Sequence, residues 1–144
     1  MASTNPIFGD AGILVQSGNP AAVSATKILK DVKYTMLYFS ASWCPPCKSF
    51  TPVLSKWYLE HKSSNLEVVF VSSDNNENDF NKYYQNMPWL SIPYENRDLV
   101  DTLISKYEVT GFPTLIIVDN STGAVISRNA RTGVMNYPEE FPWL

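Results

Sequence analysis

The stretch Trp43-Cys44-Pro45-Pro46-Cys47 decides how this chain is interpreted. It holds both cysteines of the protein and directly follows the apolar run Met-Leu-Tyr-Phe at 36–39. A buried strand that leads into Cys-x-x-Cys at the first turn of a helix is typical of a redox-active dithiol. The unpaired N–H groups and the positive dipole end of such a turn stabilise a thiolate. The pattern therefore predicts that Cys44 is the nucleophile and that Cys47, one turn further on, resolves a mixed disulfide.

The residues around the cysteines favour redox chemistry over two other roles. Pro45 and Pro46 suit the first turn of a helix, where N–H groups lack partners and the φ of proline is already helical. A zinc site would need two further ligands, and His61 is the one histidine of the chain. A purely structural disulfide across so short a loop would constrain the unfolded chain little. Without a phosphate loop or a nicotinamide signature, we expect dithiol exchange with no metal and no bound cofactor.

Size and composition indicate an ordinary globular domain. The 144 residues are enough for one sizeable core, and 44% are hydrophobic and 17% charged. The net charge of −3 argues against nucleic acid or anionic lipid as a partner. No apolar stretch approaches the roughly 20 residues of a membrane-spanning helix, and the N-terminus lacks signal-peptide features. We expect a monomeric single domain over residues 1–144, with a flexible segment over 1–10, located in the cytoplasm, with the nucleus as the alternative.

Hydrophobic patterning predicts alternating strands and helices. The expected strands cover residues 12–16, 35–40, 66–71, 114–118 and 124–128, and the expected helices cover 44 to 63–65, 75 or 76 to 85, and 97–107. Residues 21–32 fit either a short strand or one helical turn, 87–94 form an extended link, and the chain ends in a tail. This order predicts an α/β sandwich whose mixed sheet is parallel in its first half and antiparallel at its end.

A second motif, Gly111-Phe112-Pro113-Thr114, lies directly before the last hairpin. Together with residues 43–47 it resembles the thioredoxin superfamily. The resemblance implies a thioredoxin-like α/β fold: a central mixed β-sheet flanked by helices on both faces, here with an N-terminal extension. It also implies that the Phe112–Pro113 bond is cis and that Pro113 faces the reactive sulfur. The backbone of Phe112 would then be offered to an extended substrate strand.

Further motifs narrow the resemblance to the tryparedoxin and nucleoredoxin branch of that superfamily. They are Tyr38 to Cys47, Phe50-Thr51-Pro52, Met87-Pro88-Trp89-Leu90, Ala130-Arg131-Thr132 and Phe141-Pro142-Trp143. Tryparedoxins pass electrons from the dithiol trypanothione to peroxidases. The resemblance thus implies a thiol-disulfide oxidoreductase that passes electrons from a trypanothione-like dithiol or a reductase to protein disulfides, such as peroxiredoxin or glutathione-peroxidase-type enzymes.

Two other functions fit the same motifs. Similarity to nucleoredoxin implies a redox-dependent adaptor that binds a signalling partner. A thiol peroxidase is the third candidate, but peroxide reduction usually relies on a lone thiolate with a group that stabilises the leaving oxygen. The paired sulfurs fit an electron carrier better.

Several positions near the cysteines have expected roles. Thioredoxins carry a buried Asp six residues before the first cysteine; here Tyr38 stands there, which can donate a hydrogen bond but is no base near neutral pH. Asp74 is the candidate proton acceptor for Cys47, with a turn-forming Asp as the alternative. Trp43 either covers the edge of the site or simply packs. Arg131 matches a tryparedoxin arginine that attracts the acidic end of a glutathione-type substrate, or is a surface arginine without a role.

The chain departs from the tryparedoxin pattern after the third strand. Tryparedoxins usually carry Trp-Asp-Glu there, whereas this chain has Ser73-Asp74-Asn75, and the stretch from Val71 to Asp74 is similar to nucleoredoxin. Phe112 also stands where tryparedoxins tend to have Ile. These differences imply an altered surface for the reductant and leave the dithiol chemistry intact.

Overall fold

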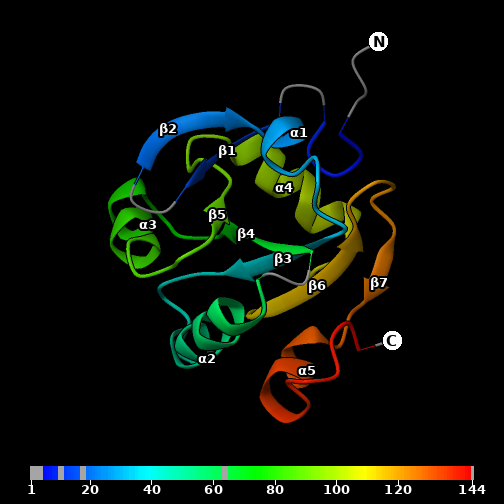
Figure 1. The fold of residues 1–144 in the computed structure, drawn as a ribbon. Helices are drawn as coiled ribbons and strands as arrows, with labels where there is room; N and C mark the ends of the chain where they lie inside the picture. Colours follow the sequence, from blue (N-terminus) through cyan, green and yellow to red (C-terminus); the bar gives the residue numbers. More distant parts are fainter. Residues whose placement is uncertain (1–4, 10–11, 17–18, 63–64, 144) are drawn as a thin grey trace.

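A mixed β-sheet forms the centre of the computed structural model, which describes residues 5–9, 12–16, 19–62 and 65–143 (Figure 1). In these residues seven strands follow the order β2-β1-β5-β4-β3-β6-β7. The strands are β1 (Ile13–Gln16), β2 (Asn19–Ser24), β3 (Tyr34–Ser40), β4 (Leu66–Ser72), β5 (Leu90–Ser91), β6 (Thr114–Asp119) and β7 (Val125–Ser127). The helices are α1 (Ala25–Ile28), α2 (Pro45–His61), α3 (Glu77–Tyr84), α4 (Arg97–Lys106) and α5 (Ala130–Asn136).

The strand that leads to the cysteines lies in the middle of the sheet, as its apolar sequence predicts. β3 pairs in parallel with β4 and antiparallel with β6, and Met36 to Phe39 are fully buried. A strand covered on both faces needs a continuous apolar run rather than an alternating one. The helix that carries the two cysteines therefore starts from the buried centre of the sheet.

Helices cover both faces of the sheet, which confirms the predicted fold class. Successive residues of β3 point to opposite faces, so Met36 and Tyr38 join one core and Leu37 and Phe39 the other. The first core contains buried residues of α2, α3 and α5, and the second contains buried residues of α1 and α4. The core under α2 is rich in aromatic rings, including Phe50, Trp57, Phe70 and Trp89.

The sheet differs from the prediction at its first edge. β1 pairs antiparallel with both β2 and β5, so the parallel part is confined to the centre, β5-β4-β3. Only two residues separate β1 from β2, and a link that short can join only antiparallel strands. The ambiguous segment 21–32 contains both structures that were considered, since the end of β2 is followed by the single turn of α1.

Two elements of secondary structure were not predicted from the sequence. Residues 87–94 contain β5, which pairs with Val69 and Phe70 of β4 and is only two residues long because Pro88 and Pro93 flank it. Residues expected in a tail form α5, whose Ala130 and Val134 are buried in the first core. It spans only seven residues and contains Gly133, and isolated helices this short are unstable in water, so tertiary packing stabilises it.

Residues 5–9 of the N-terminal segment pack against the domain. Ile7 and Phe8 are buried in the second core, beside α4 and the sheet, and the side chain of Asn5 accepts hydrogen bonds from both of their N–H groups. The flexibility expected over residues 1–10 stays a prediction, and residues 1–4 and 10 lie outside the described residues. The predicted helix end at 63–65 falls partly outside the described residues; α2 ends at His61.

The C-terminal residues close the first core through Gly133 of α5. A Cβ at this position would overlap the indole of Trp143, whose ring lies 5.3 Å from that of Trp57 on α2. Alanine favours a helix over glycine by about 1 kcal/mol. Because Trp143 would have to move, we nevertheless expect Gly133→Ala to lower the free energy of unfolding and to increase the solvent exposure of tryptophan in fluorescence.

The matched background for this test is Trp143→Ala. There the space beside residue 133 is empty, so the same Gly133→Ala change should stabilise the protein in urea unfolding. An equal effect in both backgrounds would contradict the role assigned to the Gly133–Trp143 contact.

Candidate active site

The two cysteines lie at the start of α2, directly after the central strand. Cys44 is the N-cap of the helix, and its sulfur accepts a hydrogen bond from the N–H of Cys47 at 3.3 Å. The pair forms a disulfide, with Pro45 and Pro46 exposed in the first helical turn. Cys44 keeps 6% of its surface exposed whereas Cys47 has none. The sulfur nearer the helix end is thus the more accessible one.

The loop before β6 faces Cys44, as the family resemblance implies. The Phe112–Pro113 peptide bond is cis, and the carbonyl oxygen of Phe112 lies 3.7 Å from the sulfur of Cys44. Pro113 is buried and Phe112 is half-buried. The backbone of the residue before the proline therefore lies directly beside the more exposed sulfur.

Trp43 forms one edge of this site. Half of its surface is exposed (51%), its indole N–H donates to the carbonyl of Ser73 at 2.8 Å, and its ring meets that of Phe112 edge-on at 5.8 Å. Trp43 thus links the loops that follow β3 and β4 to the loop before β6. Its hydrogen bond and ring contact give it a defined orientation, which suits the expected role at the edge better than packing alone.

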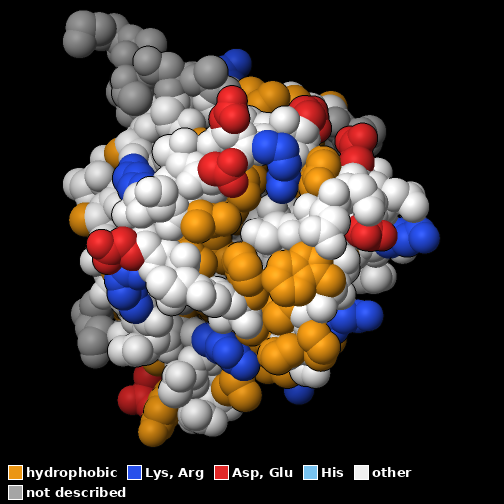
Figure 2. Space-filling view, turned by 180° about the vertical axis from the view of Figure 1, so that it is seen from behind, with side chains coloured by type: hydrophobic (Ala, Val, Ile, Leu, Met, Phe, Trp, Pro, Cys, Tyr) orange, Lys and Arg blue, Asp and Glu red, His pale blue; other side chains and the backbone are white. Residues whose placement is uncertain are grey.

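Hydrophobic side chains gather on the face of the molecule shown in Figure 2. They form a patch across its centre, and side chains of both charges lie around it. Grouped apolar side chains at a surface are a common feature of sites that bind another protein.

Tyr38 lies beneath α2 and is fully buried. Its hydroxyl is 2.6 Å from that of Thr51 and 3.5 Å from the carbonyl oxygen of Cys47. Burial raises the pKa of Tyr38 well above its ordinary value, so the hydroxyl keeps its proton at any physiological pH. The structure therefore gives Tyr38 the expected hydrogen-bonding place near the second cysteine.

Sequence reasoning missed two residues beside Tyr38, namely Thr51 and Tyr83. The Thr51 hydroxyl donates to the carbonyl of Cys47 at 2.9 Å, and Tyr83 of α3 contacts Thr51 at 2.7 Å. The position of Thr51 four residues after Cys47 is the signal for the first contact, because a helical Thr can bond the carbonyl one turn back. The approach of Tyr83 depends on how α3 packs and has no local signal.

Asp74 is buried at the end of β4, and both of its carboxylate oxygens are in use. One accepts from the N–H of Ser42 at 2.7 Å and the other from the hydroxyl of Ser72 at 2.6 Å. These contacts tie the loop that carries Trp43 and Cys44 to the neighbouring strand. Asp74 therefore anchors the loop, and its role as proton acceptor stays a prediction.

Arg131 is exposed on α5 and lies near α2. Its guanidinium carbon is 5.9 Å from the ring centre of Phe50, six residues after Cys44. α5 thus carries Arg131 to the flank of the active-site helix. Its contact with a substrate stays a prediction.

His61, the last residue of α2, is held by packing and a nearby carboxylate. His61 stacks on Trp57, with ring centres 4.7 Å apart, and its Nε2 lies 3.5 Å from a carboxylate oxygen of Glu139. Within the described ranges, no three side chains of His, Cys, Asp or Glu gather closely enough to hold a metal ion. No helix in this part of the chain is long and apolar enough to cross a membrane.

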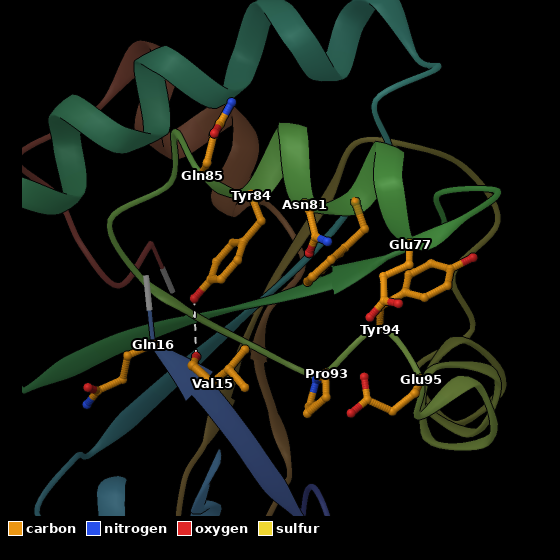
Figure 3. A pocket seen from close by; sticks show the side chains of 10 residues that line it. Val15, Gln16, Glu77, Asn81, Tyr84, Gln85, Pro93, Tyr94 and Glu95 are labelled. Carbon is orange, nitrogen blue, oxygen red and sulfur yellow. Dashed lines mark hydrogen bonds between the residues drawn. The ribbon is translucent and has the colours of Figure 1, made fainter. Parts of the chain in front are cut away.

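A cavity of about 380 Å³ lies between α3, the end of β1 and the loop after β5 (Figure 3). Aromatic side chains from Phe80, Tyr84 and Tyr94 line it together with Glu77 and Glu95. Tyr84 points from α3 toward β1, and its hydroxyl donates to the carbonyl of Val15 at 3.1 Å. Neither cysteine lines this cavity, so it is separate from the disulfide site.

Comparison with known proteins agrees with this geometry. A model of the thioredoxin-like family matches residues 31–125. Tryparedoxin of Trypanosoma brucei brucei is 49% identical over 114 residues, which cover 77% of this chain and 79% of that protein. Human nucleoredoxin is 44% identical over 111 residues, which are 74% of this chain but only 25% of that much longer protein.

Solved structures of tryparedoxins have the same fold. Tryparedoxin II from C. fasciculata superimposes with a TM-score of 0.87 at 36% identity, covering 95% of this chain and 94% of that one. A tryparedoxin II structure complexed with glutathionylspermidine gives a TM-score of 0.84 at 37% identity, covering 99% of this chain and 93% of that one. Since the family match, the identity over most of a tryparedoxin and the placement of the Cys44–Cys47 pair all agree, this chain belongs to the thioredoxin-like family and is a tryparedoxin-like thiol-disulfide oxidoreductase.

Proposed function

We propose that this oxidoreductase carries electrons from a low-molecular-weight dithiol to protein disulfides, such as those of peroxidases, with Cys44 as the attacking and Cys47 as the resolving thiol. The observation that carries the proposal is the different environment of the two sulfurs. Cys44 is the more exposed one and receives an N–H bond at the helix end, whereas Cys47 is fully buried. An accessible sulfur that is stabilised as thiolate is suited to begin thiol-disulfide exchange.

The exchange then runs in two steps. The Cys44 thiolate attacks one sulfur of the partner disulfide, so that a Cys44–partner bond forms and the other partner sulfur leaves as a thiolate. Cys47 gives up its proton, either to water or to the proposed acceptor Asp74, and attacks Cys44, which forms the Cys44–Cys47 bond and releases the second partner sulfur. The partner gains two electrons, and the dithiol donor later returns them by the same chemistry in reverse.

A cationic thiol of the glutathione–polyamine type is the donor that we propose. The tryparedoxin II structure with glutathionylspermidine supports this class of reductant, which in trypanothione carries two thiols on one polyamine. The exposed Asn75 lies one residue after Asp74, where tryparedoxins usually have a carboxylate. The missing negative charge should weaken the docking of a cationic donor by about 0.2–1 kcal/mol, or up to roughly fivefold.

We therefore expect the Ser73→Trp, Asn75→Glu double variant to be reduced faster by trypanothione than the natural protein, by about twofold to fivefold. The gain should shrink as salt is added, because exposed charge pairs are screened. Stopped-flow tryptophan fluorescence after mixing the oxidised protein with trypanothione measures the rate.

Uncharged dithiothreitol is the control reductant, and its rate should be the same for both proteins. If the double variant gains nothing with trypanothione, or gains equally with dithiothreitol, positions 73 and 75 do not select the donor.

A redox-dependent adaptor is the second candidate function. It is favoured by the 44% identity to nucleoredoxin and by the sequence from Val71 to Asp74. An insulin-reduction assay with dithiothreitol separates the two: an electron carrier turns over many times, whereas an adaptor forms a stable complex with little turnover. For either function we propose a monomer in the cytoplasm, where thiols stay reduced, and size-exclusion chromatography and cell fractionation test this.

A further inference from the structure

Four hydroxyl groups form a continuous chain beneath the second cysteine. The Ser40 hydroxyl lies 2.7 Å from that of Tyr83, which lies 2.7 Å from that of Thr51, and Tyr38 lies 2.6 Å from Thr51 on its other side. Thr51 in turn contacts the carbonyl oxygen of Cys47 at 2.9 Å. The chain therefore joins β3, α3 and α2 at the peptide group of Cys47.

The distances and the count of donors together set the direction of these hydrogen bonds. The Thr51 hydroxyl lies 2.9 Å from the carbonyl oxygen of Cys47 and the Tyr38 hydroxyl 3.5 Å, so we assign Thr51 as the donor to this carbonyl. With its one proton used there, Thr51 accepts from both Tyr38 and Tyr83. Tyr83 has then used its own proton, so Ser40 donates to Tyr83. Every proton in the chain points toward Cys47, and hydrogen bonds aligned in this way strengthen one another.

The backbone of Cys47 is thus held through both its N–H and its carbonyl group. Its N–H donates to the sulfur of Cys44, and its carbonyl accepts from the hydroxyl of Thr51. Pro52 has no N–H to donate to the carbonyl of Lys48, so the backbone ladder of α2 lacks one bond at the residue after Cys47. The Thr51 hydroxyl, held by Tyr38 of β3 and Tyr83 of α3, adds a contact to the turn beside this gap.

We propose that Thr51 and Tyr83 are positioning residues for the second step of the exchange, in which the sulfur of Cys47 attacks Cys44 and releases the partner. This rests on the proposed order of attack by the two cysteines. In that step the Cys47–Cys44 bond forms while the bond between Cys44 and the partner breaks, and the partner sulfur leaves with the electron pair. The hydroxyl chain holds Cys47 at the approach that this displacement needs.

The two steps can be separated with dithiobis-nitrobenzoate, an aromatic disulfide that releases a coloured thiolate in each of them. Attack by Cys44 releases the first thiolate, and closure by Cys47 releases the second. Loss of one net hydrogen bond should slow the second release about threefold to tenfold in Tyr83→Phe and in Thr51→Val, and leave the first release unchanged. Stopped-flow absorbance with the reduced full-length protein measures both.

Tyr84→Phe is the matched control, because it removes a tyrosine hydroxyl from the neighbouring position of α3. That hydroxyl is within hydrogen-bond distance of the carbonyls of Trp89 and Val15, the second of which is drawn in Figure 3. Tyr84→Phe should lower stability without changing either release. Thr51→Ser keeps the hydroxyl and should recover the rate of the second release.

Three results would overturn the proposal: a second release that is unchanged in Tyr83→Phe and Thr51→Val, equal slowing in Tyr84→Phe, or no recovery in Thr51→Ser. If instead the proposed order of attack by the two cysteines is wrong, a different result is expected. In that case Cys44→Ser, rather than Cys47→Ser, would give the single rapid release.

Discussion

Replacing Cys44 with serine is expected to reduce the turnover of protein disulfides to the uncatalysed background. Cys44 is the more exposed of the two cysteines and its sulfur accepts the N–H of Cys47 at the helix end, whereas a serine hydroxyl is not ionised near neutral pH. Cys47→Ser should also stop turnover, but after the first step, so that a stable mixed disulfide with the partner accumulates. Insulin reduction measures turnover, and non-reducing electrophoresis with mass spectrometry detects the trapped adduct.

Ser49→Ala, on the exposed side of the same helix, is the control and should behave like the natural protein. The variant in which adducts accumulate shows which cysteine is the nucleophile. If adducts collect in Cys44→Ser and not in Cys47→Ser, the buried sulfur is the nucleophile, contrary to the exposure of the two residues. If both single variants turn over, the disulfide is not the reactive centre.

Asp74→Ala should produce the second large effect, on stability and rate together. The change removes the acceptors of the Ser42 N–H and the Ser72 hydroxyl. Each hydrogen bond to a charged group contributes about 1.5–3 kcal/mol. The two bonds together amount to about 3–6 kcal/mol, so we expect the melting temperature to fall by roughly 6–24 °C. Disulfide exchange should slow as well, because the loop from Ser42 to Cys44 loses its anchor. Calorimetry and insulin reduction measure the two quantities.

The Asp74→Asn variant distinguishes between two roles of Asp74, as an anchor of the loop and as a proton acceptor. The amide keeps one acceptor oxygen, so an anchoring role predicts partial recovery of both melting temperature and rate. A protein that is as stable as the natural one but as slow as Asp74→Ala would instead support proton transfer by the carboxylate and contradict the anchor. Asp101→Ala, at an exposed position of α4, controls for the loss of one negative charge.

The sequence by itself determined the unit that carries the chemistry. An apolar run for a central strand, a cysteine as N-cap and prolines in the first turn are local features, and each acts on residues within one or two turns of itself. β3, the start of α2 and the greater exposure of Cys44 were therefore predicted correctly. The cis Phe112–Pro113 bond was also predicted correctly, from the resemblance of residues 111–114 to the family motif.

The tertiary structure decided what surrounds that unit. The carbonyl of Phe112 and Cys44 are 68 residues apart in the chain, and Tyr83 is 32 residues from Thr51. Such contacts follow from sheet order and from the angle at which α3 packs, for which the residues involved carry no local pattern. The helix α5 and the strand β5 were missed for the same reason. Their intrinsic propensities are weak, and they form because burial against the finished sheet outweighs the conformational entropy that their ordering costs.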